Sequence, residues 1–124
     1  MEYQLKQPYT SFKRYCKTLT LREDPELIEA YKKIHQPGET WPEISEGMKE
    51  VGIVDMEIYI CGTRLFMIMD TLPEFEHDRA MEELATKPRQ KEWEAFVAKF
   101  QETPSHATAD EKWQLMERIY KLDP

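Results

Sequence analysis

The stretch "IVDMEIYICGTRLFMIMD", residues 53 to 70, contains two apolar runs separated by Gly62 and Thr63. A short turn with glycine between two such runs is typical of a β-hairpin. Along the first run, apolar residues alternate with more polar ones: Val54, Met56, Ile58 and Ile60 against Asp55, Glu57 and Tyr59. We therefore expect a hairpin with one face against helices and a more polar opposite face.

The residues before the hairpin predict one strand and two helices. Segment 12–21, "FKRYCKTLTL", is rich in β-branched and aromatic residues, which favours a strand. Asp24 precedes a proline and is expected to be the N-cap of a helix. A Pro-Gly pair stops this helix near Gln36. A short second helix is expected over residues 42–52.

The residues after the hairpin predict two more helices and a final strand. Segment 75–86 is an acidic helical pattern that ends shortly before a second helix start. That second helix has apolar residues at helical spacing: Trp93, Phe96, Val97 and Phe100. Segment 102–111 is expected to be a loop, and segment 116–122, "MERIYKL", a last strand.

The predicted order is strand, helix, strand, strand, helix, strand, with each helical region divided in two. This order indicates an α+β, ferredoxin-like split βαβ fold with a four-stranded antiparallel sheet. Helices on one face leave the other face open, and that face contains Tyr59. Packing two such sheets face to face, as a dimeric α/β barrel, would cover it, so we expect a homodimer. Residues 1–11 are expected to be a polar tail before a single domain, 12–124.

Composition limits the classes of protein to which the chain can belong. The chain has 124 residues, 40% of them hydrophobic, enough for one domain with a core and a pocket. The net charge is −7 and basic residues alternate with acidic ones, so we expect no nucleic-acid partner. No apolar run is long enough for a membrane span or a leader. Cys16 and Cys61 have no metal-ligand spacing, and we expect both to be buried thiols in the cytoplasm.

Sequence motifs give no support for a metal or cofactor. The chain has three histidines and no nucleophile elbow, phosphate-binding loop or zinc-ligand spacing. His77 lies among carboxylates and is expected on a solvated helix face, while His106 is expected in an exposed loop. We therefore expect chemistry without a metal ion and without a cofactor.

His35 follows Tyr31 by one helical turn, at the edge of the apolar stripe and before the Pro-Gly turn. An imidazole with an ordinary pKa near 6.5 can donate or accept a proton at neutral pH. A packed or capping histidine is the alternative interpretation, and Tyr31 also suits a core. Trp93 has core periodicity, although an aromatic ring also offers a sugar a flat apolar surface.

Several segments together resemble the L-rhamnose mutarotase family: "DP…AYKKIH…WPEI", "IYI", "RLFMIMD", "EWEAF" and "MERIYKL". They span about residues 12 to 122 in the family's order, and the Tyr-x3-His pair followed by Trp-Pro-Glu is the most specific part. The resemblance implies a small cytoplasmic homodimer that interconverts the α and β anomers of a deoxy sugar. It also implies His35 as the proton donor and Tyr31 and Trp93 as substrate-binding residues.

Two positions depart from the family pattern. Met56 stands where the family has a second substrate-contacting tyrosine, and Glu92 replaces the first of two tryptophans, so only Trp93 matches. The resemblance therefore leaves L-rhamnose and L-fucose as candidate 6-deoxyhexoses. Whether a carboxylate such as Asp70 or Glu92 assists His35 is open at this point.

Two other functions also suit the predicted architecture. One is a cofactor-independent oxygenase on the same dimeric fold, which would consume oxygen. The other is a non-catalytic ligand-binding module, which would bind no sugar in a screen. The Tyr-x3-His and Trp-Pro-Glu match favours the mutarotase over both.

Overall fold

The computed structural model describes residues 1–3 and 11–123. Along the chain the elements are β1 (Lys13–Thr20), α1 (Pro25–Ile34), α2 (Pro42–Glu50), β2 (Ile53–Cys61), β3 (Arg64–Thr71), α3 (His77–Ala85), α4 (Gln90–Val97), α5 (Ala109–Lys112) and β4 (Gln114–Leu115). The strands form one sheet in the order β2-β3-β1-β4, and every neighbouring pair is antiparallel. This arrangement confirms the predicted ferredoxin-like α+β fold.

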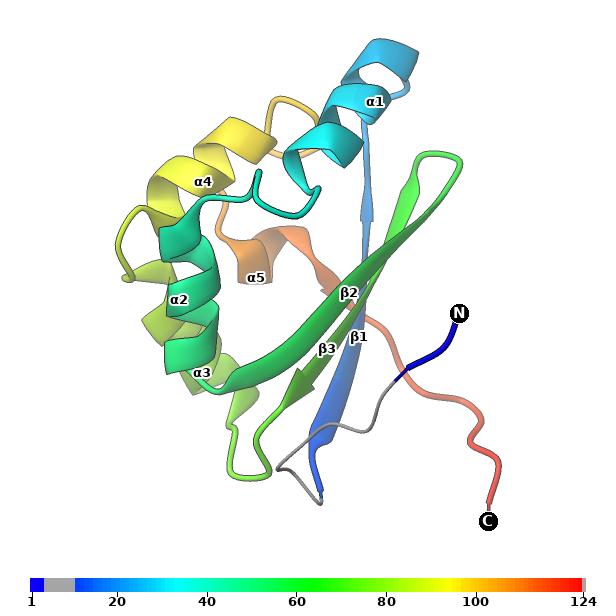
Figure 1. Ribbon diagram of the computed structural model, residues 1–124, viewed down its shortest axis with the longest axis vertical. Coiled ribbons are helices and arrows are strands. Elements are labelled where there is room, and N and C mark those ends of the chain that lie inside the picture. Colours follow the sequence, from blue (N-terminus) through cyan, green and yellow to red (C-terminus); the bar gives the residue numbers. More distant parts are fainter. Residues whose placement is uncertain (4–10, 124) are drawn as a thin grey trace.

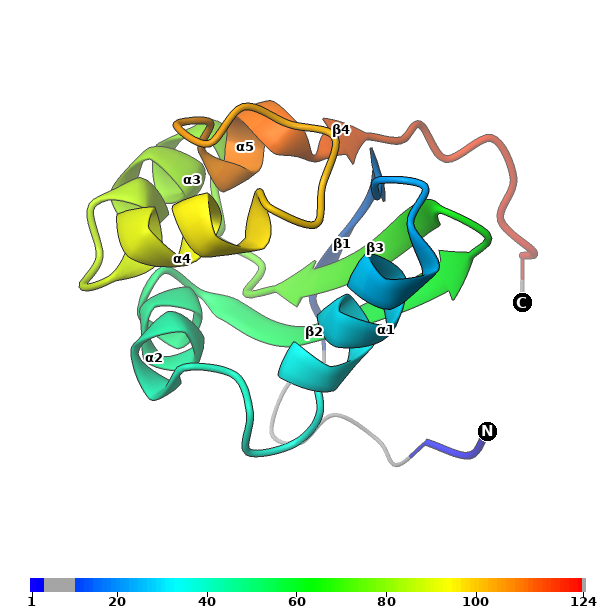
Figure 2. The ribbon, with the colours of Figure 1, turned by 90° about the horizontal axis from the view of Figure 1, so that it is seen from above.

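The helices form a single layer on one side of the sheet (Figure 1). From above, α2, α3, α4 and α5 form a group, and α1 lies apart from them (Figure 2). Alternation along β1 points Leu19 toward the helices, and Leu65 and Met69 of β3 face the same way. These side chains meet Leu84 of α3 and Val97 of α4 in the hydrophobic core.

Helix α1 begins and ends where its sequence predicts. The Asp24 carboxylate accepts hydrogen bonds from the backbone N–H groups of Glu26 and Leu27, which caps the first turn. His35 is the C-cap residue, and Gly38 follows with φ +86°, a left-handed conformation that glycine adopts without strain. The helix therefore holds His35 at its last turn, directly before the chain reverses.

The predicted alternation of β2 is wrong at its first residues. The pairing of β2 with β3 shifts between Ile53 and Asp55, which makes Val54 the extra residue of a β-bulge. As a result Ile53, rather than Val54, joins Met56 on the helical side. At the other end of β2, Ile60 is on the helical side, as predicted, but it is 36% exposed.

The predicted last strand, 116–122, is wrong over its whole length, because β4 is Gln114–Leu115. Strand β4 has two residues, and beyond it the Met116 N–H donates to the Cys16 carbonyl at 2.7 Å. The chain then leaves the sheet and extends away from the body of the molecule (Figures 1 and 2), with Ile119 91% exposed. The apolar pattern of this segment is strand-like, but no strand within the described residues pairs with it.

The predicted loop 102–111 contains the start of a helix. Thr108 caps α5 in a reciprocal capping box, because its hydroxyl accepts from the Glu111 N–H and the Glu111 carboxylate accepts from the Thr108 N–H. The Thr-x-x-Glu spacing was therefore a helix signal. This turn places Lys112 in the interior, where it is 4% exposed.

The expectations for the two cysteines, for His77 and for His106 have different outcomes. Both cysteines are unpaired, but Cys16 is only half-buried and Cys61 is exposed, since both lie on the face of the sheet without helices. His77 is not solvated, because its ring rests against Tyr15 at 5.0 Å between centroids. His106 is exposed, as expected.

The polar tail is described only in part. Residues 4–10 of the predicted tail lie outside the described residues. The Tyr3 hydroxyl reaches the open face of the sheet, where it donates to Glu57 at 2.7 Å and lies 2.6 Å from the Tyr59 hydroxyl. Every helix in the described parts of the chain is too short or too polar to span a bilayer.

Candidate active site

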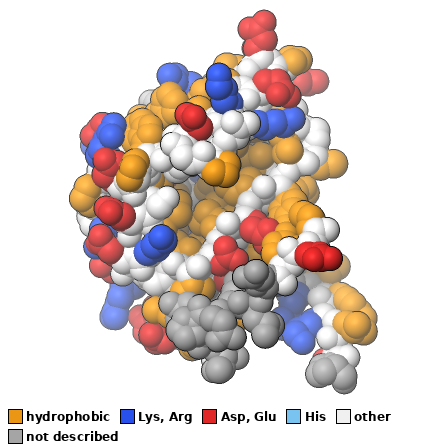
Figure 3. Space-filling model, in the orientation of Figure 1, with side chains coloured by type: hydrophobic (Ala, Val, Ile, Leu, Met, Phe, Trp, Pro, Cys, Tyr) orange, Lys and Arg blue, Asp and Glu red, His pale blue; other side chains and the backbone are white. Residues whose placement is uncertain are grey.

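A cavity of about 340 Å³ lies between the helical face of the sheet and helices α2, α3, α4 and α5. Small-molecule sites typically measure about 300–1,000 Å³, so this volume suits a small ligand. Figure 3 shows the molecule hollowed between helices and sheet, with hydrophobic side chains in the depression. Most of the wall is apolar, and its larger polar side chains are Lys17, His35, Gln90, Glu94 and Gln101.

His35 lines this cavity from the end of α1. Its Nδ1 lies 2.8 Å from the Tyr31 backbone carbonyl, which can only accept, so Nδ1 carries the hydrogen. Nε2 is then the nitrogen that a ligand can use. Burial lowers the pKa of His35 below its ordinary value, and the hydrogen bond to the Tyr31 carbonyl opposes this shift. At neutral pH, His35 is therefore mainly uncharged, with Nε2 as a proton acceptor.

The structure brings the three predicted site residues together. The Tyr31 ring lies on one side of the His35 imidazole at 4.3 Å between centroids, and Trp93 contacts it edge-on at 5.7 Å. Trp93 forms part of the cavity wall. Tyr31 lies behind His35, and its hydroxyl is close to the side chain of Gln101, which does line the cavity. Burial raises the pKa of Tyr31 to about 12, so its hydroxyl keeps its proton.

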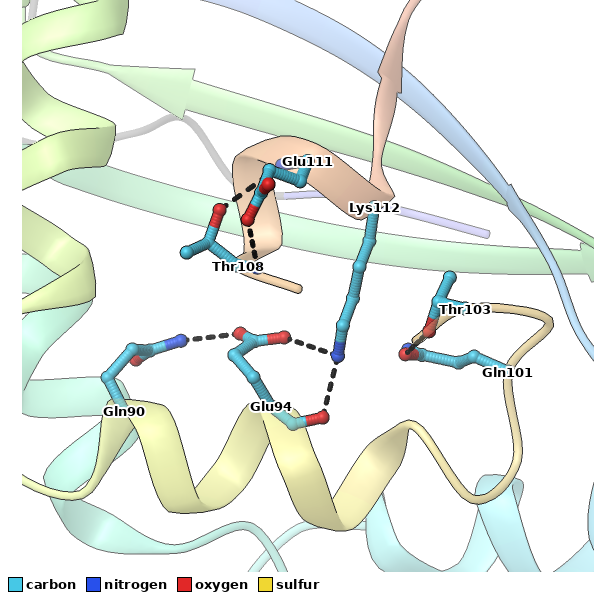
Figure 4. A network of polar contacts seen from close by, with 7 residues as sticks. All are labelled: Gln90, Glu94, Gln101, Thr103, Thr108, Glu111 and Lys112. Atoms are coloured by element: carbon cyan, nitrogen blue, oxygen red, sulfur yellow. Dashed lines mark hydrogen bonds and ion pairs between the residues drawn. The ribbon is translucent and has the colours of Figure 1, made fainter. Parts of the chain in front are cut away.

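The carboxylate on the cavity wall belongs to Glu94, and it is held by a buried network (Figure 4). Lys112 Nζ donates to Glu94 Oε1 at 3.0 Å and to the Glu94 carbonyl at 2.6 Å. Gln90 Nε2 donates to Glu94 Oε2 at 2.6 Å. Two donors fix both oxygens, so this carboxylate presents its remaining lone pairs in one orientation.

The two carboxylates considered from sequence lie elsewhere. Asp70 pairs with Arg14 through two hydrogen bonds of 2.7 and 2.9 Å, and both residues lie on the face of the sheet without helices. Glu92 points outward from α4 and bonds Arg89 at 3.4 Å. Met56, the other departure from the family pattern, does lie on the cavity wall. The position at which the sequence resemblance led us to expect a tyrosine therefore faces the cavity.

Sequence reasoning missed Lys17 and Glu94. Lys17 lies on the same face of β1 as Tyr15 and Leu19, which is the buried face, but a lysine there breaks the apolar pattern. Glu94 directly follows Trp93 in a helix whose spacing was analysed only for its apolar stripe. In both cases a charged side chain lies at a position that the neighbouring periodicity marks as interior.

The arrangement suits proton transfer on a small polar ligand. It combines a neutral imidazole with an available Nε2, a fixed carboxylate, an aromatic ring and an apolar wall. Within the described residues, no group of three or more His, Cys, Asp or Glu side chains could hold a metal ion.

Comparisons with known proteins agree on one family. The L-rhamnose mutarotase family model matches residues 14–122. The chain is 34% identical over 112 residues to an L-fucose mutarotase of Xanthomonas campestris, covering 90% of each protein. It is 29% identical over 91 residues to an L-rhamnose mutarotase of Burkholderia ambifaria, covering 72% of this chain and 82% of that protein. The crystal structure of an L-rhamnose mutarotase from Formosa agariphila has the same fold, with a TM-score of 0.66, 20% identity, and coverage of 90% of this chain and 99% of that one. Since the family model covers most of the length, the chain belongs to the L-rhamnose mutarotase family.

Proposed function

We propose that this protein is an isomerase that interconverts the α and β anomers of a 6-deoxyhexose, L-fucose or L-rhamnose. Family membership supports anomer interconversion, and the two relatives named above are mutarotases of these sugars. The observation that favours the reaction most directly is His35, whose Nδ1 is bound to a carbonyl and whose imidazole lines the cavity beside Trp93. The oxygenase and the non-catalytic module have no comparable support.

In the proposed mechanism, His35 is the catalytic group. The reaction removes the proton of the anomeric hydroxyl and delivers one to the ring oxygen as the bond between C1 and that oxygen breaks. Neutral His35 accepts the proton of the anomeric hydroxyl at Nε2, and the imidazolium so formed delivers it to the ring oxygen as the bond to C1 breaks. When the ring closes, His35 takes the proton back from that oxygen and returns it to the new anomeric oxygen. Between these events the open aldehyde turns about its C1–C2 bond and exposes the other face. No electron transfer is involved, and one well-placed acid/base group contributes roughly 10²- to 10⁴-fold in rate.

Trp93 and Tyr31 support this chemistry in different ways. Trp93 gives the sugar ring an apolar surface on the cavity wall. Tyr31 orients His35, because its carbonyl fixes Nδ1 and its ring packs against the imidazole. Its hydroxyl lies beside Gln101, which lines the cavity and can contact the sugar. Glu94 accepts hydrogen bonds from sugar hydroxyls, since its two oxygens are already held in place.

The expected substrate preference follows from Met56, which lies on the cavity wall. A tyrosine hydroxyl at this position would hydrogen-bond one sugar hydroxyl, and methionine cannot. We expect L-fucose to be handled at least as well as L-rhamnose, in line with the identity to an L-fucose mutarotase.

The test of this function is saturation-transfer NMR between the anomeric protons of each sugar, with and without the protein. Catalysed exchange of either sugar supports the function. An absence of catalysis on both sugars would reject it, and a rhamnose preference above about tenfold would reject the substrate assignment.

We also infer a cytoplasmic homodimer. The open face of the sheet has half-buried Phe66 and Ile68, and the arm after β4 leaves Ile119 and Leu122 largely exposed. Apolar surface of this extent suits a second copy of the chain. An exposed unpaired thiol, Cys61, suits a reducing compartment. Sedimentation that detects only monomer at micromolar concentration would contradict the dimer.

A further inference from the structure

The cavity contains a buried ammonium group whose role the proposed mechanism does not explain. Lys17 is 1% exposed, and its Nζ has no hydrogen-bond partner among the described residues. In the sheet it lies opposite Met67 of β3 and Leu115 of β4. A buried charge without a partner destabilises a fold, so most buried lysines are paired. Lys112, the other buried lysine, has two hydrogen bonds to Glu94.

The position of Lys17 indicates what could satisfy it. Its side chain lines the same cavity as His35 but belongs to the sheet, whereas His35 belongs to the helical layer. Gln90 Oε1, on the α4 wall, is also buried without a hydrogen-bond partner in the described part of the chain. One unsatisfied donor and one unsatisfied acceptor thus face a single cavity. A polyhydroxylated ligand offers partners to both.

We propose that Lys17 contacts the substrate, donating a hydrogen bond from Nζ to an oxygen of the sugar on the sheet side of the cavity. This inference rests on the proposed function, and it adds a residue to the site rather than a new reaction. A donor on this wall complements neutral His35, which accepts a proton from the anomeric hydroxyl. Burial also lowers the pKa of Lys17, while Asp110 and Asp78 oppose that shift, so the group gives up a proton more readily than an exposed lysine.

A structural role for Lys17 predicts the opposite effect on stability. If Nζ only held the fold together, its removal would lower the melting temperature. If Nζ instead binds a ligand, Lys17→Met removes a buried charge that has no hydrogen-bond partner among the described residues and keeps an unbranched side chain of similar length. The folded protein should then gain stability, because replacing buried charges by apolar groups is often stabilising. We expect Tm to be unchanged or to rise by up to about 3 °C.

The experiment compares Lys17→Met with a matched control, Lys13→Met. Lys13 lies on the same strand and the same face, but it is exposed and donates to the Phe75 carbonyl outside the cavity. Exchange rates by saturation-transfer NMR are measured over a range of L-fucose concentrations, together with Tm. We expect Lys17→Met to lose at least about 30-fold in kcat/KM with an unchanged or higher Tm. Lys13→Met should stay within about twofold of the wild type.

The outcomes separate the two proposals. If the wild type exchanges neither sugar and neither sugar changes its tryptophan fluorescence, the function and the role of Lys17 both fall. If the wild type is active and Lys17→Met keeps more than a third of its kcat/KM, only the role of Lys17 is rejected. If Lys17→Met and Lys13→Met lower both Tm and kcat/KM by similar amounts, both lysines have a structural role. This result would also reject the role of Lys17 in binding the substrate.

Discussion

Replacing His35 by asparagine separates its chemical role from its structural one. In His35→Asn the side-chain amide nitrogen takes the place of Nδ1 and can still donate to the Tyr31 carbonyl, 2.8 Å away in the wild type. The variant lacks Nε2, the proposed proton acceptor. The hydrogen bond that it keeps contributes about 0.5–1.5 kcal/mol to stability. The ring contacts to Tyr31 and Trp93 are lost, but Tyr31 and Trp93 stay packed against other core residues.

The expected loss of activity is much larger than the loss of stability. A positioned acid/base group contributes about 10²- to 10⁴-fold, equivalent to roughly 2.7–5.4 kcal/mol of the activation barrier. His35→Asn should therefore lose at least a hundredfold in catalysed anomeric exchange by saturation-transfer NMR, while circular dichroism and Tm report a folded protein. His106→Asn, in the exposed loop, is the matched control and should be unchanged. A folded His35→Asn protein with more than a tenth of wild-type activity would refute the reasoning.

Three further predictions use the same assay. Burial lowers the pKa of His35 below its ordinary value near 6.5, so the rate of catalysed exchange should be constant above about pH 7. The rate should fall as the pH drops below about 6.5 and His35 becomes protonated. A rate that falls with rising pH would instead indicate that the charged form of His35 is needed. Treatment with EDTA should leave the rate unchanged, and a loss that a divalent ion restores would contradict catalysis by side chains alone. Tyr31→Phe keeps the carbonyl that fixes His35 and removes only the hydroxyl beside Gln101, so it should raise KM by about three- to tenfold with little change in kcat. A hundredfold loss in kcat would show that the hydroxyl takes part in the chemistry.

The parts of the fold that depend on local sequence could be predicted. The hairpin follows from a glycine turn between two apolar runs, and α1 follows from the Asp24 cap and the Pro-Gly stop. The bulge at Val54 depends on the register between two strands, and sequence alternation alone does not contain that information. The last strand failed although β1 continues to Lys13 beyond its pairing with β4, so the chain could have paired there, and the apolar pattern alone does not decide whether it does.

The site residues also fall into two groups, those that the sequence could identify and those that it could not. Tyr31, His35 and Trp93 could be named from the family pattern, and the structure places them in contact. The roles assigned to them stay predictions. Lys17 and Glu94 could not be found by searching for motifs, because their significance depends on burial beside a cavity. A lysine at an inward position of an otherwise apolar strand is the sequence signal that could have identified Lys17.

The protonation states of Tyr31 and His35 determine which group accepts the first proton. Tyr31 keeps its proton because burial raises its pKa to about 12, and His35 gives up its proton because burial lowers its pKa. The same apolar surroundings thus keep the phenol protonated, which makes it a poor acid, and keep the imidazole neutral and able to accept a proton. Glu94 cannot replace His35 as readily, because Lys112 and Gln90 already hold its carboxylate through hydrogen bonds. Among the titratable side chains on the cavity wall, the physical chemistry therefore favours His35 as the first proton acceptor, and the remaining buried charges are better suited to binding the sugar.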